Sequence, residues 1–149
     1  MLRRIKKYRK AIFIVVYKKI NNKILYLLLK RKMHWIGWEF PKGGIEFFET
    51  RRKTVKREVK EETGLKAIKI INHKKKGKYE YSKNIPDRPY IGQTYSLYSA
   101  EVHDKKIKID NKEHSEYKWL PFKQAYKKLT WKNQKECLKI VNEYLKKIK

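Results

Sequence analysis

Two apolar segments joined by a pair of asparagines are the strongest constraint on the fold of this chain. Residues 11–19 read AIFIVVYKK and residues 23–31 read KILYLLLKR, with Asn21 and Asn22 between them. β-branched and aromatic residues favour strands, and asparagine favours a tight turn. Because its apolar run is nearly continuous, the first segment is typical of a buried strand. We expect the second segment to pair with it as a hairpin.

The remaining segments alternate between helical and extended patterns in an irregular order. Residues 50–63 lack glycine and proline and favour a helix that ends at Gly64, and residues 131–148 place apolar side chains at helical spacing. Further strands are expected in WIGWEF (ending in a loop), LKAIKIINHK, QTYSLYSAEV and EYKWLPF, with a long loop or loose hairpin at 77–92. The pattern predicts an α/β sandwich with a mixed sheet, as a single domain over residues 1–149.

Positive charge dominates the composition. The chain holds 41 Lys and Arg against 15 Asp and Glu, a formal net charge of +26. Such a charge attracts polyanions such as RNA. Lysine is scattered over the whole length, which favours a lysine-rich background as the main cause and polyanion attraction as a consequence.

Cysteine content and apolar run lengths bear on location. The one cysteine, Cys137, excludes an intrachain disulfide and suits a reducing cytosol. The apolar run at 11–17 is too short to span a bilayer. We therefore expect a soluble cytoplasmic protein without a membrane partner, either a monomer or a homodimer.

The acids are concentrated in one stretch. Residues 39–62 contain six of the fifteen, namely Glu39, Glu46, Glu49, Glu58, Glu61 and Glu62. On a helix that turns by about 100° per residue, the last three share a strip beside the buried face. Like charges at this spacing repel each other. Either the surrounding lysines and arginines relieve the repulsion, or a hard cation such as Mg²⁺ or Mn²⁺ does so.

The stretch GGIEFFETRRKTVKREVKEETGL, residues 43–65, favours the cation. It resembles the signature of the Nudix hydrolases: a glycine, five residues, a glutamate, seven residues, then Arg-Glu-aliphatic-x-Glu-Glu-x-Gly-aliphatic. The matching positions are Gly43, Glu49, Arg57, Glu58, Val59, Glu61, Glu62, Gly64 and Leu65. The resemblance implies an α/β/α sandwich in which a loop–helix–loop presents metal to a pyrophosphate.

The resemblance also implies roles for individual residues. Glu58 and Glu62, usually with Glu61, would bind Mg²⁺, with Mn²⁺ as a possible substitute. The metal would neutralise the phosphate oxygens and activate a water for attack on phosphorus. One glutamate would then take the proton, either a glutamate of the helix or a distant one. Glu113 and Glu116 are the distant candidates, and Glu116 is the one we include among the predicted catalytic residues.

Other positions of the signature concern architecture. The resemblance implies that Arg57 pairs with Glu49 and holds the loop against the helix. Gly43 permits a close backbone approach. Phe47 and Phe48 occupy the places where most relatives have Pro-Gly, and a turn of that type is not available to two phenylalanines. We expect at least one of the two rings to pack under the loop, the alternative being stacking on a base.

Two further segments indicate a branch of the family. WEFPKGGIE (38–46) and IGQTYSLYSAEV (91–102) resemble segments of dinucleoside polyphosphate hydrolases and RNA 5′-pyrophosphohydrolases. That resemblance implies base stacking by Tyr79 or Tyr81, upstream of Pro86, and phosphate contacts from Lys42 and Arg31. The four histidines show no metal-binding spacing.

Three functions remain at this point. The first is a bis(5′-nucleosyl)-tetraphosphatase-like enzyme that cleaves dinucleoside polyphosphates of the diadenosine tetraphosphate type. The second is removal of pyrophosphate from triphosphorylated RNA ends, which the basic surface favours. The third is a nucleic-acid-binding protein on a Nudix scaffold without turnover, which the retained glutamates disfavour.

Overall fold

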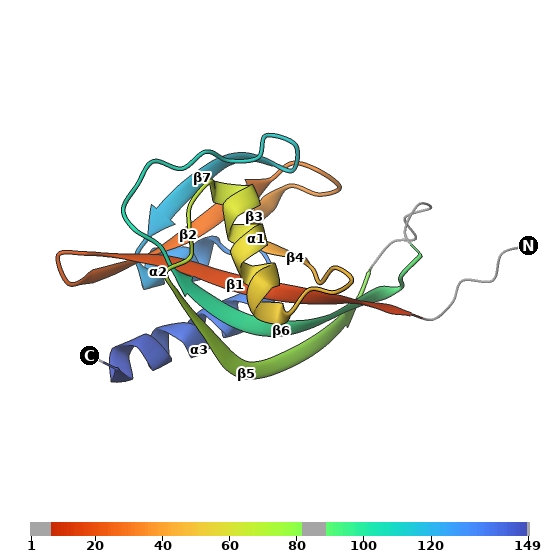
Figure 1. Ribbon diagram of the computed structural model, residues 1–149. Helices are drawn as coiled ribbons and strands as arrows, with labels where there is room; N and C mark the ends of the chain where they lie inside the picture. The colour runs from red at the N-terminus through yellow and green to blue at the C-terminus, as the bar shows by residue number, and fades with distance from the viewer. Residues whose placement is uncertain (1–6, 82–88, 149) are drawn as a thin grey trace, which may run out of the picture.

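A seven-stranded mixed sheet lies at the centre of the computed structural model, which describes residues 7–81 and 89–148 (Figure 1). Its strands are β1 (Tyr8–Ile20), β2 (Lys23–Arg31), β3 (Gly37–Glu39), β4 (Lys42–Gly44), β5 (Lys69–Glu80), β6 (Gly92–Glu101) and β7 (His114–Leu120). The order is β3-β2-β1-β6-β5, with β4 also paired to β1 and β7 to β2. β1 and β6 run parallel, and the other pairs are antiparallel.

The β1–β2 hairpin confirms the prediction made from the two apolar segments. Asn21 and Asn22 have φ values of 48° and 65°, as the central residues of a type I′ turn require. Residues of β1 alternate between two core clusters: Ile12, Ile14 and Val16 lie in one, and Phe13, Val15 and Tyr17 in the other. The continuous apolar run of β1 therefore reflects a sheet that is covered on both faces.

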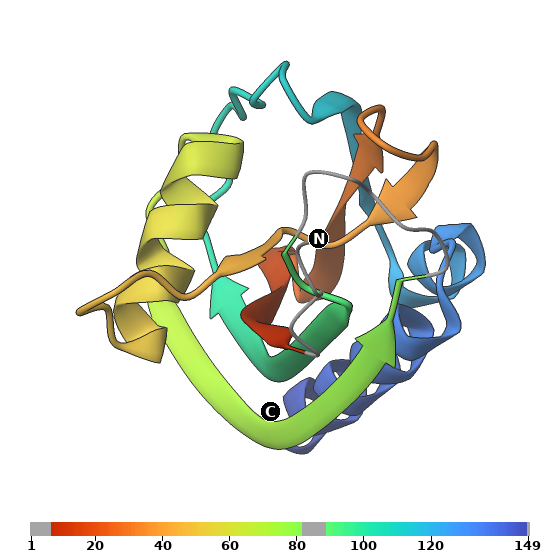
Figure 2. The same ribbon diagram turned by 90° about the vertical axis from the view of Figure 1, so that its right-hand side faces the viewer.

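Helices cover the two faces (Figure 2). α1 (Arg51–Thr63) packs Val55 and Val59 into one cluster. α2 (Phe122–Lys128) and α3 (Lys132–Lys147) pack Ala125 and Leu138 into the other. The predicted α/β/α arrangement with a mixed sheet is confirmed. None of the described helices is long and apolar enough to cross a membrane.

Two local expectations were wrong. Residues 77–80 belong to β5 and pair with β6, although a loop or loose hairpin was expected there. A side chain at Gly77 would overlap the ring of Tyr95, so this glycine permits close packing within a strand. Residues 42–44, expected in a loop, form β4 on β1. The strand expected to end at Pro121 does end there, and a short helix that was not predicted, α2, follows it.

The caps of α1 explain why this segment is helical. The side chain of Thr50 accepts a hydrogen bond from the backbone N–H of Lys53 at 3.2 Å. At the other end, Gly64 has a φ of 76° and donates its N–H to the carbonyl of Lys60 at 2.9 Å. Both ends of the helix that carries the acids are therefore fixed.

Replacing Gly64 should cost stability through the backbone alone. A Cβ at this position would meet nothing closer than Lys108 Cβ at 3.5 Å, so only the left-handed φ penalises a side chain. We expect Gly64→Ala to lower the free energy of unfolding by about 1 kcal/mol, and Gly64→Asn by less, because asparagine tolerates this φ. Urea unfolding measures both; equal stability of Gly64→Ala and wild type would contradict the assigned role.

Candidate active site

The guanidinium of Arg57 joins the loop after β4 to α1. Its Nε and Nη2 donate to the two carboxylate oxygens of Glu49 at 2.6 and 2.9 Å, and Nη2 also donates to the carbonyl of Gly44 at 2.9 Å. Hydrogen bonds from Arg57 and Thr54 lower the pKa of Glu49 to about 2. The structure thus contains the Arg57–Glu49 pair that the signature implies, and the pair fixes the loop to the second turn of the helix.

Three acids of α1 face this loop or the cavity beside it. Nη1 of Arg57 donates to Glu58 at 2.7 Å and to Glu61 at 3.2 Å. Glu58 and Glu62 are buried, whereas the side chain of Glu61 is 56% exposed. A Cβ at Gly43 would overlap the carboxylate of Glu58, which explains why glycine occupies that position.

Burial makes the ionised forms of two of these acids costly. It raises the pKa of Glu58 to about 7, although Arg57 acts in the opposite direction. Burial also raises the pKa of Glu62, and the neighbouring charges of Glu58, Glu39 and Glu113 raise it further. One oxygen of Glu62, Oε2, is buried and accepts no hydrogen bond from the described residues.

A fourth acid, Glu39 at the end of β3, is completely buried beside these carboxylates. Arg31 Nη1 lies 3.1 Å and His114 Nε2 lies 2.8 Å from its Oε2, and Lys42 Nζ lies 3.2 Å from its Oε1. Burial would raise the pKa of Glu39, but Lys42, His114 and Arg31 outweigh it and lower that pKa to about 2. Glu39 therefore orients the two cationic side chains that we predicted to contact phosphates.

The structure separates the two distant glutamates. Glu113 lines the cavity, and its carboxylate, that of Glu62 and a ring nitrogen of His114 lie within 4.8 Å of one another. Glu116 is exposed on β7, 3.9 Å from Lys30, and does not line the cavity. Of the two distant candidates, Glu113 therefore lies at the cavity and Glu116, the one included among the predicted catalytic residues, does not. His114 lies beside acids despite the lack of metal-binding spacing.

The donor set suits a hard divalent cation. Glu58, Glu62 and Glu113 offer carboxylate oxygens from two chain segments, and hard cations prefer such ligands. The raised pKa values and the unpartnered oxygen of Glu62 indicate negative charge that the described residues do not neutralise. A cation at this place would relieve the cost of ionising these acids.

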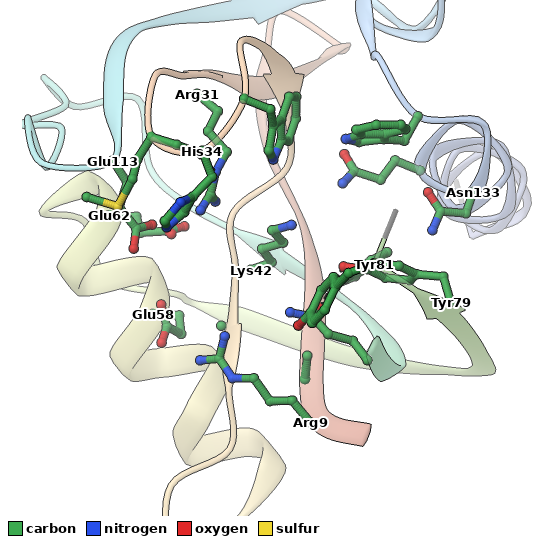
Figure 3. Close-up of a pocket in the computed structure, with 18 of the residues that line it drawn as sticks. Arg9, Arg31, His34, Lys42, Glu58, Glu62, Tyr79, Tyr81, Glu113 and Asn133 are labelled. Atoms are coloured by element: carbon green, nitrogen blue, oxygen red, sulfur yellow. Dashed lines mark hydrogen bonds between the residues drawn. The ribbon is translucent and has the colours of Figure 1, made fainter. Parts of the chain in front are cut away.

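The cavity itself has a volume of about 780 Å³ and two unlike walls (Figure 3). Glu58 and Glu62 project from α1 on one side, Tyr79, Tyr81 and Asn133 lie on the other, and Lys42 lies between them. The rings of Tyr79 and Tyr81 meet edge to face at 6.1 Å. Tyr79 also donates its hydroxyl to Gln93 at 2.7 Å. Pro86, named with these tyrosines in the sequence prediction, is outside the described residues.

Several lining residues were not predicted. Arg9, His34 and a second aromatic pair, Trp35 and Trp131 with ring centroids 5.2 Å apart, also line the cavity. They come from separate segments of the chain, so no local motif joins them all. Glu39 had a usable signal, because a lone acid inside the apolar stretch WEF is unusual for a buried strand.

The expectation that Phe47 or Phe48 packs under the loop was wrong. The two residues are 86% and 90% exposed, and neither lines the cavity. They occupy the tip of a turn whose ends are Glu46 and Glu49, joined by a backbone hydrogen bond of 3.0 Å. Their rings contact each other, with centroids 4.0 Å apart.

Comparison with known families accounts for the loop, the helix and their acids. A family model described as the NUDIX domain matches residues 7–139. The chain belongs to this family. It is a Nudix hydrolase, and the family assignment covers the whole sheet and the first half of α3.

Two of the curated relatives carry different named activities. The chain is 32% identical to an RNA pyrophosphohydrolase of a Nitratiruptor species, over 95% of this chain and 96% of the relative. It is 29% identical to the asymmetrical bis(5′-nucleosyl)-tetraphosphatase of Mus musculus, over 84% and 83%. A solved structure of a C. elegans Ap4A hydrolase binary complex has the same fold, with a TM-score of 0.76 at 23% identity over 92% and 97% of the chains.

The buried acids of this Nudix hydrolase predict a pH-dependent stability. Between the ordinary carboxyl pKa of 4.5 and about 7, the folded protein binds more protons than the unfolded chain, because the folded-state pKa values are raised. Stability is therefore present at low pH and is lost as pH rises through the folded pKa. We expect the metal-free protein to lose on the order of 2 kcal/mol of unfolding free energy between about pH 5 and about pH 8.

Added Mg²⁺ should restore more stability at the higher pH, where the acids are ionised and able to bind it. Urea unfolding with EDTA or with Mg²⁺ measures both effects. The double variant Glu58→Gln, Glu62→Gln is the control. Its unfolding free energy should depend less on pH and less on Mg²⁺ than that of the wild type. A metal-free protein whose stability rises over this pH range would contradict the raised pKa values.

Proposed function

We propose that this Nudix hydrolase removes pyrophosphate from the 5′-triphosphorylated end of RNA with the help of bound Mg²⁺. The observation that carries the proposal is the two-walled cavity, in which buried acids on α1 lie opposite two tyrosines, with cations between them. Such a cavity suits a ligand with a charged polyphosphate at one end and an aromatic base at the other.

Each wall would have its own task. Glu58 and Glu62, with Glu61 at the exposed rim, would hold the cation, which when bound neutralises phosphate oxygens and lowers the pKa of the attacking water. Arg57 would keep Glu58 in position through their 2.7 Å hydrogen bond. The carboxylate of Glu113, on the opposite segment, would accept the proton from the attacking water.

The remaining cavity residues would orient the substrate. Lys42 and Arg31, held by Glu39, and Arg9 line the cavity and would contact the phosphate chain. Tyr81 would stack on the terminal base, which is worth roughly 1–3 kcal/mol. Tyr79, whose hydroxyl is bonded to Gln93, would support Tyr81 from behind as an edge-to-face neighbour.

RNA is favoured over a dinucleotide by two observations. The relative that matches 95% of this chain at 32% identity carries the name RNA pyrophosphohydrolase. The net charge of +26 also favours long polyanions, since each neutralised phosphate adds to affinity. Dinucleoside polyphosphates, favoured by the sequence resemblance, remain the second candidate. The murine tetraphosphatase relative and the second aromatic pair, Trp35 and Trp131, support them.

A direct comparison of substrates tests the proposal. Purified protein with Mg²⁺ receives, separately, a 5′-triphosphorylated RNA oligonucleotide and diadenosine tetraphosphate, and products are resolved by chromatography. We expect a higher kcat/KM for the RNA, with release of pyrophosphate. Faster cleavage of diadenosine tetraphosphate would contradict the proposal and support dinucleoside polyphosphate hydrolysis. If neither substrate is cleaved, a nucleic-acid-binding protein without turnover is favoured.

Glu62→Gln supplies the matched control for these assays. Glutamine copies the protonated carboxyl but cannot ionise to hold the cation, so kcat should fall on the order of 10²–10³-fold. Because burial already raises the pKa of Glu62, the variant should be at least as stable as wild type at neutral pH. Wild-type turnover in Glu62→Gln would refute the metal assignment.

Glu113 and Glu116 offer a second matched pair. Loss of a general base costs roughly 10²–10⁴-fold in rate, so Glu113→Gln should lower kcat by at least about 100-fold. Glu116→Gln removes an exposed acid outside the cavity and should leave kcat within about twofold. Initial rates at saturating Mg²⁺ measure both variants. A larger loss in Glu116→Gln than in Glu113→Gln would overturn the choice of base.

A further inference from the structure

The turn at Glu46–Glu49 displays two phenylalanine rings to solvent, and we refer to it as the Phe turn. Glu46 N–H also donates to the carboxylate of Glu49 at 3.1 Å, and Glu49 is fixed by Arg57, so the turn is held from both ends. Phe48 has a φ of 66°, a conformation that is costly for a bulky residue. The exposed rings contribute almost no hydrophobic stabilisation, and the backbone strain of Phe48 opposes stability. A role of the two phenylalanines in binding a partner would explain why they are present despite this cost.

A second surface lies along α1, which we refer to as the basic groove. It has a volume of about 550 Å³ and is lined by Arg52, Lys56, Lys60 and Lys66, with Ala67 and Ile68 as its apolar part. The first three side chains are four residues apart and therefore form one stripe along the helix. The groove runs between this stripe and the segment that leads to β5.

The cations of the basic groove have no acidic partners in the part of the chain that the structure describes. Across residues 7–81 and 89–148, none of the four forms an ion pair with an Asp or Glu. The acids nearest in sequence are already engaged, because Arg57 pairs with Glu46, Glu49, Glu58 and Glu61. Four like charges beside one another repel, and a bound anion would relieve that repulsion.

The Phe turn connects the cavity with the start of the basic groove. Arg9 lines the cavity, and its guanidinium lies so close to Gly44 that a side chain there would overlap it. The Phe turn begins two residues after Gly44, and Arg52 follows it in the first turn of α1. Figure 2 shows the loop between β4 and α1 projecting outward at the beginning of this helix.

We propose that the Phe turn and the basic groove bind the single-stranded body of an RNA whose 5′ end occupies the cavity. Cations bind the phosphates regardless of sequence, and exposed aromatic rings stack on bases. The proposal rests on the proposed function, because it extends that substrate beyond its first nucleotides. An anionic lipid surface is the competing partner, but the cations line a groove, which admits a narrow chain and not a flat bilayer.

Binding of a fluorescent RNA of about 20 nucleotides with a 5′-hydroxyl end tests the basic groove. This RNA has no 5′ phosphates to hydrolyse, so the result does not depend on turnover. The variant Arg52→Gln, Lys56→Gln, Lys60→Gln should bind about 10-fold more weakly at about 0.1 M salt, and its log–log salt slope should fall by about 2. The control variant Lys139→Gln, Lys146→Gln, Lys147→Gln makes the same charge change on exposed residues of α3.

The control should retain its affinity within about twofold of wild type, because its lysines lie on the helix across the sheet. Equal losses in the two triple variants would mean that RNA responds to net charge alone and would overturn the proposal. No loss in the groove variant would overturn it as well.

The variant Phe47→Ser, Phe48→Gly tests the Phe turn. Glycine suits the positive φ of Phe48, so the urea midpoint should stay the same or rise while RNA affinity falls several-fold. The same proteins are mixed with phosphatidylserine-rich vesicles in a flotation assay. Vesicle binding that is lost in this variant, with RNA binding unchanged, would assign the turn to a membrane surface and overturn the proposal.

Kinetic measurements distinguish a failure of the groove proposal from a failure of the proposed function. The groove variant should raise KM for a triphosphorylated RNA of the same length about 10-fold while leaving kcat, and the cleavage of diadenosine tetraphosphate, unchanged. A wild-type protein that binds the 5′-hydroxyl RNA through the groove, but cleaves no triphosphorylated RNA, would contradict the proposed function and not the groove. An unchanged KM for the long RNA would contradict the groove and not the function.

Discussion

The ion pairs of Arg57 are the interaction on which the rest of the site depends. One guanidinium bonds the carboxylates of Glu49, Glu58 and Glu61 and the carbonyl of Gly44. Without it, the loop would lose its main attachment to the second turn of α1, and the acids of that helix would repel each other with no compensation. Arginine suits this position because its planar fork offers five donors in fixed directions. The same residue therefore builds the loop and makes a cluster of acids tolerable.

The buried acids fall into two electrostatic classes, which explains why they have different tasks. Glu39 remains ionised because Lys42, His114 and Arg31 surround it, and it fixes these side chains at the edge of the cavity. Glu58 and Glu62 have too few cationic neighbours, so burial raises their pKa values. A buried acid with a structural role is neutralised by cationic side chains of the protein, whereas a buried acid that binds a ligand is neutralised by that ligand. On this criterion Glu39 positions other groups, and the acids of α1 are the ones that we propose to bind the cation.

Sequence patterns predicted the parts of the fold that local physics determines. The hairpin turn at Asn21–Asn22 and the glycine cap at Gly64 each depend on a φ preference that the residue itself supplies. Features that depend on tertiary contacts were missed. β5 continues through Gly77, where the ring of Tyr95 leaves no room for a side chain. Glu113 lies inside the cavity and Glu116 outside it, in the segment where β7 pairs with β2 and the register shifts next to Arg31. No pattern in the sequence encodes that shift.

The cluster of Glu58, Glu62 and Glu113 on one side of the cavity would couple substrate binding to cation binding. Arg57 draws in the acids near α1, so among the described residues the stripe of cations along the basic groove has no acidic partner and would attract a polyanion. The 5′ phosphates of such a polyanion would then meet Glu58, Glu62 and Glu113, whose carboxylates repel phosphate. A divalent cation reverses the sign of the field at this wall, because it adds two positive charges beside the carboxylates. The basic surface would therefore retain the RNA body with or without metal, whereas its triphosphate end would enter the cavity only when the cation is bound.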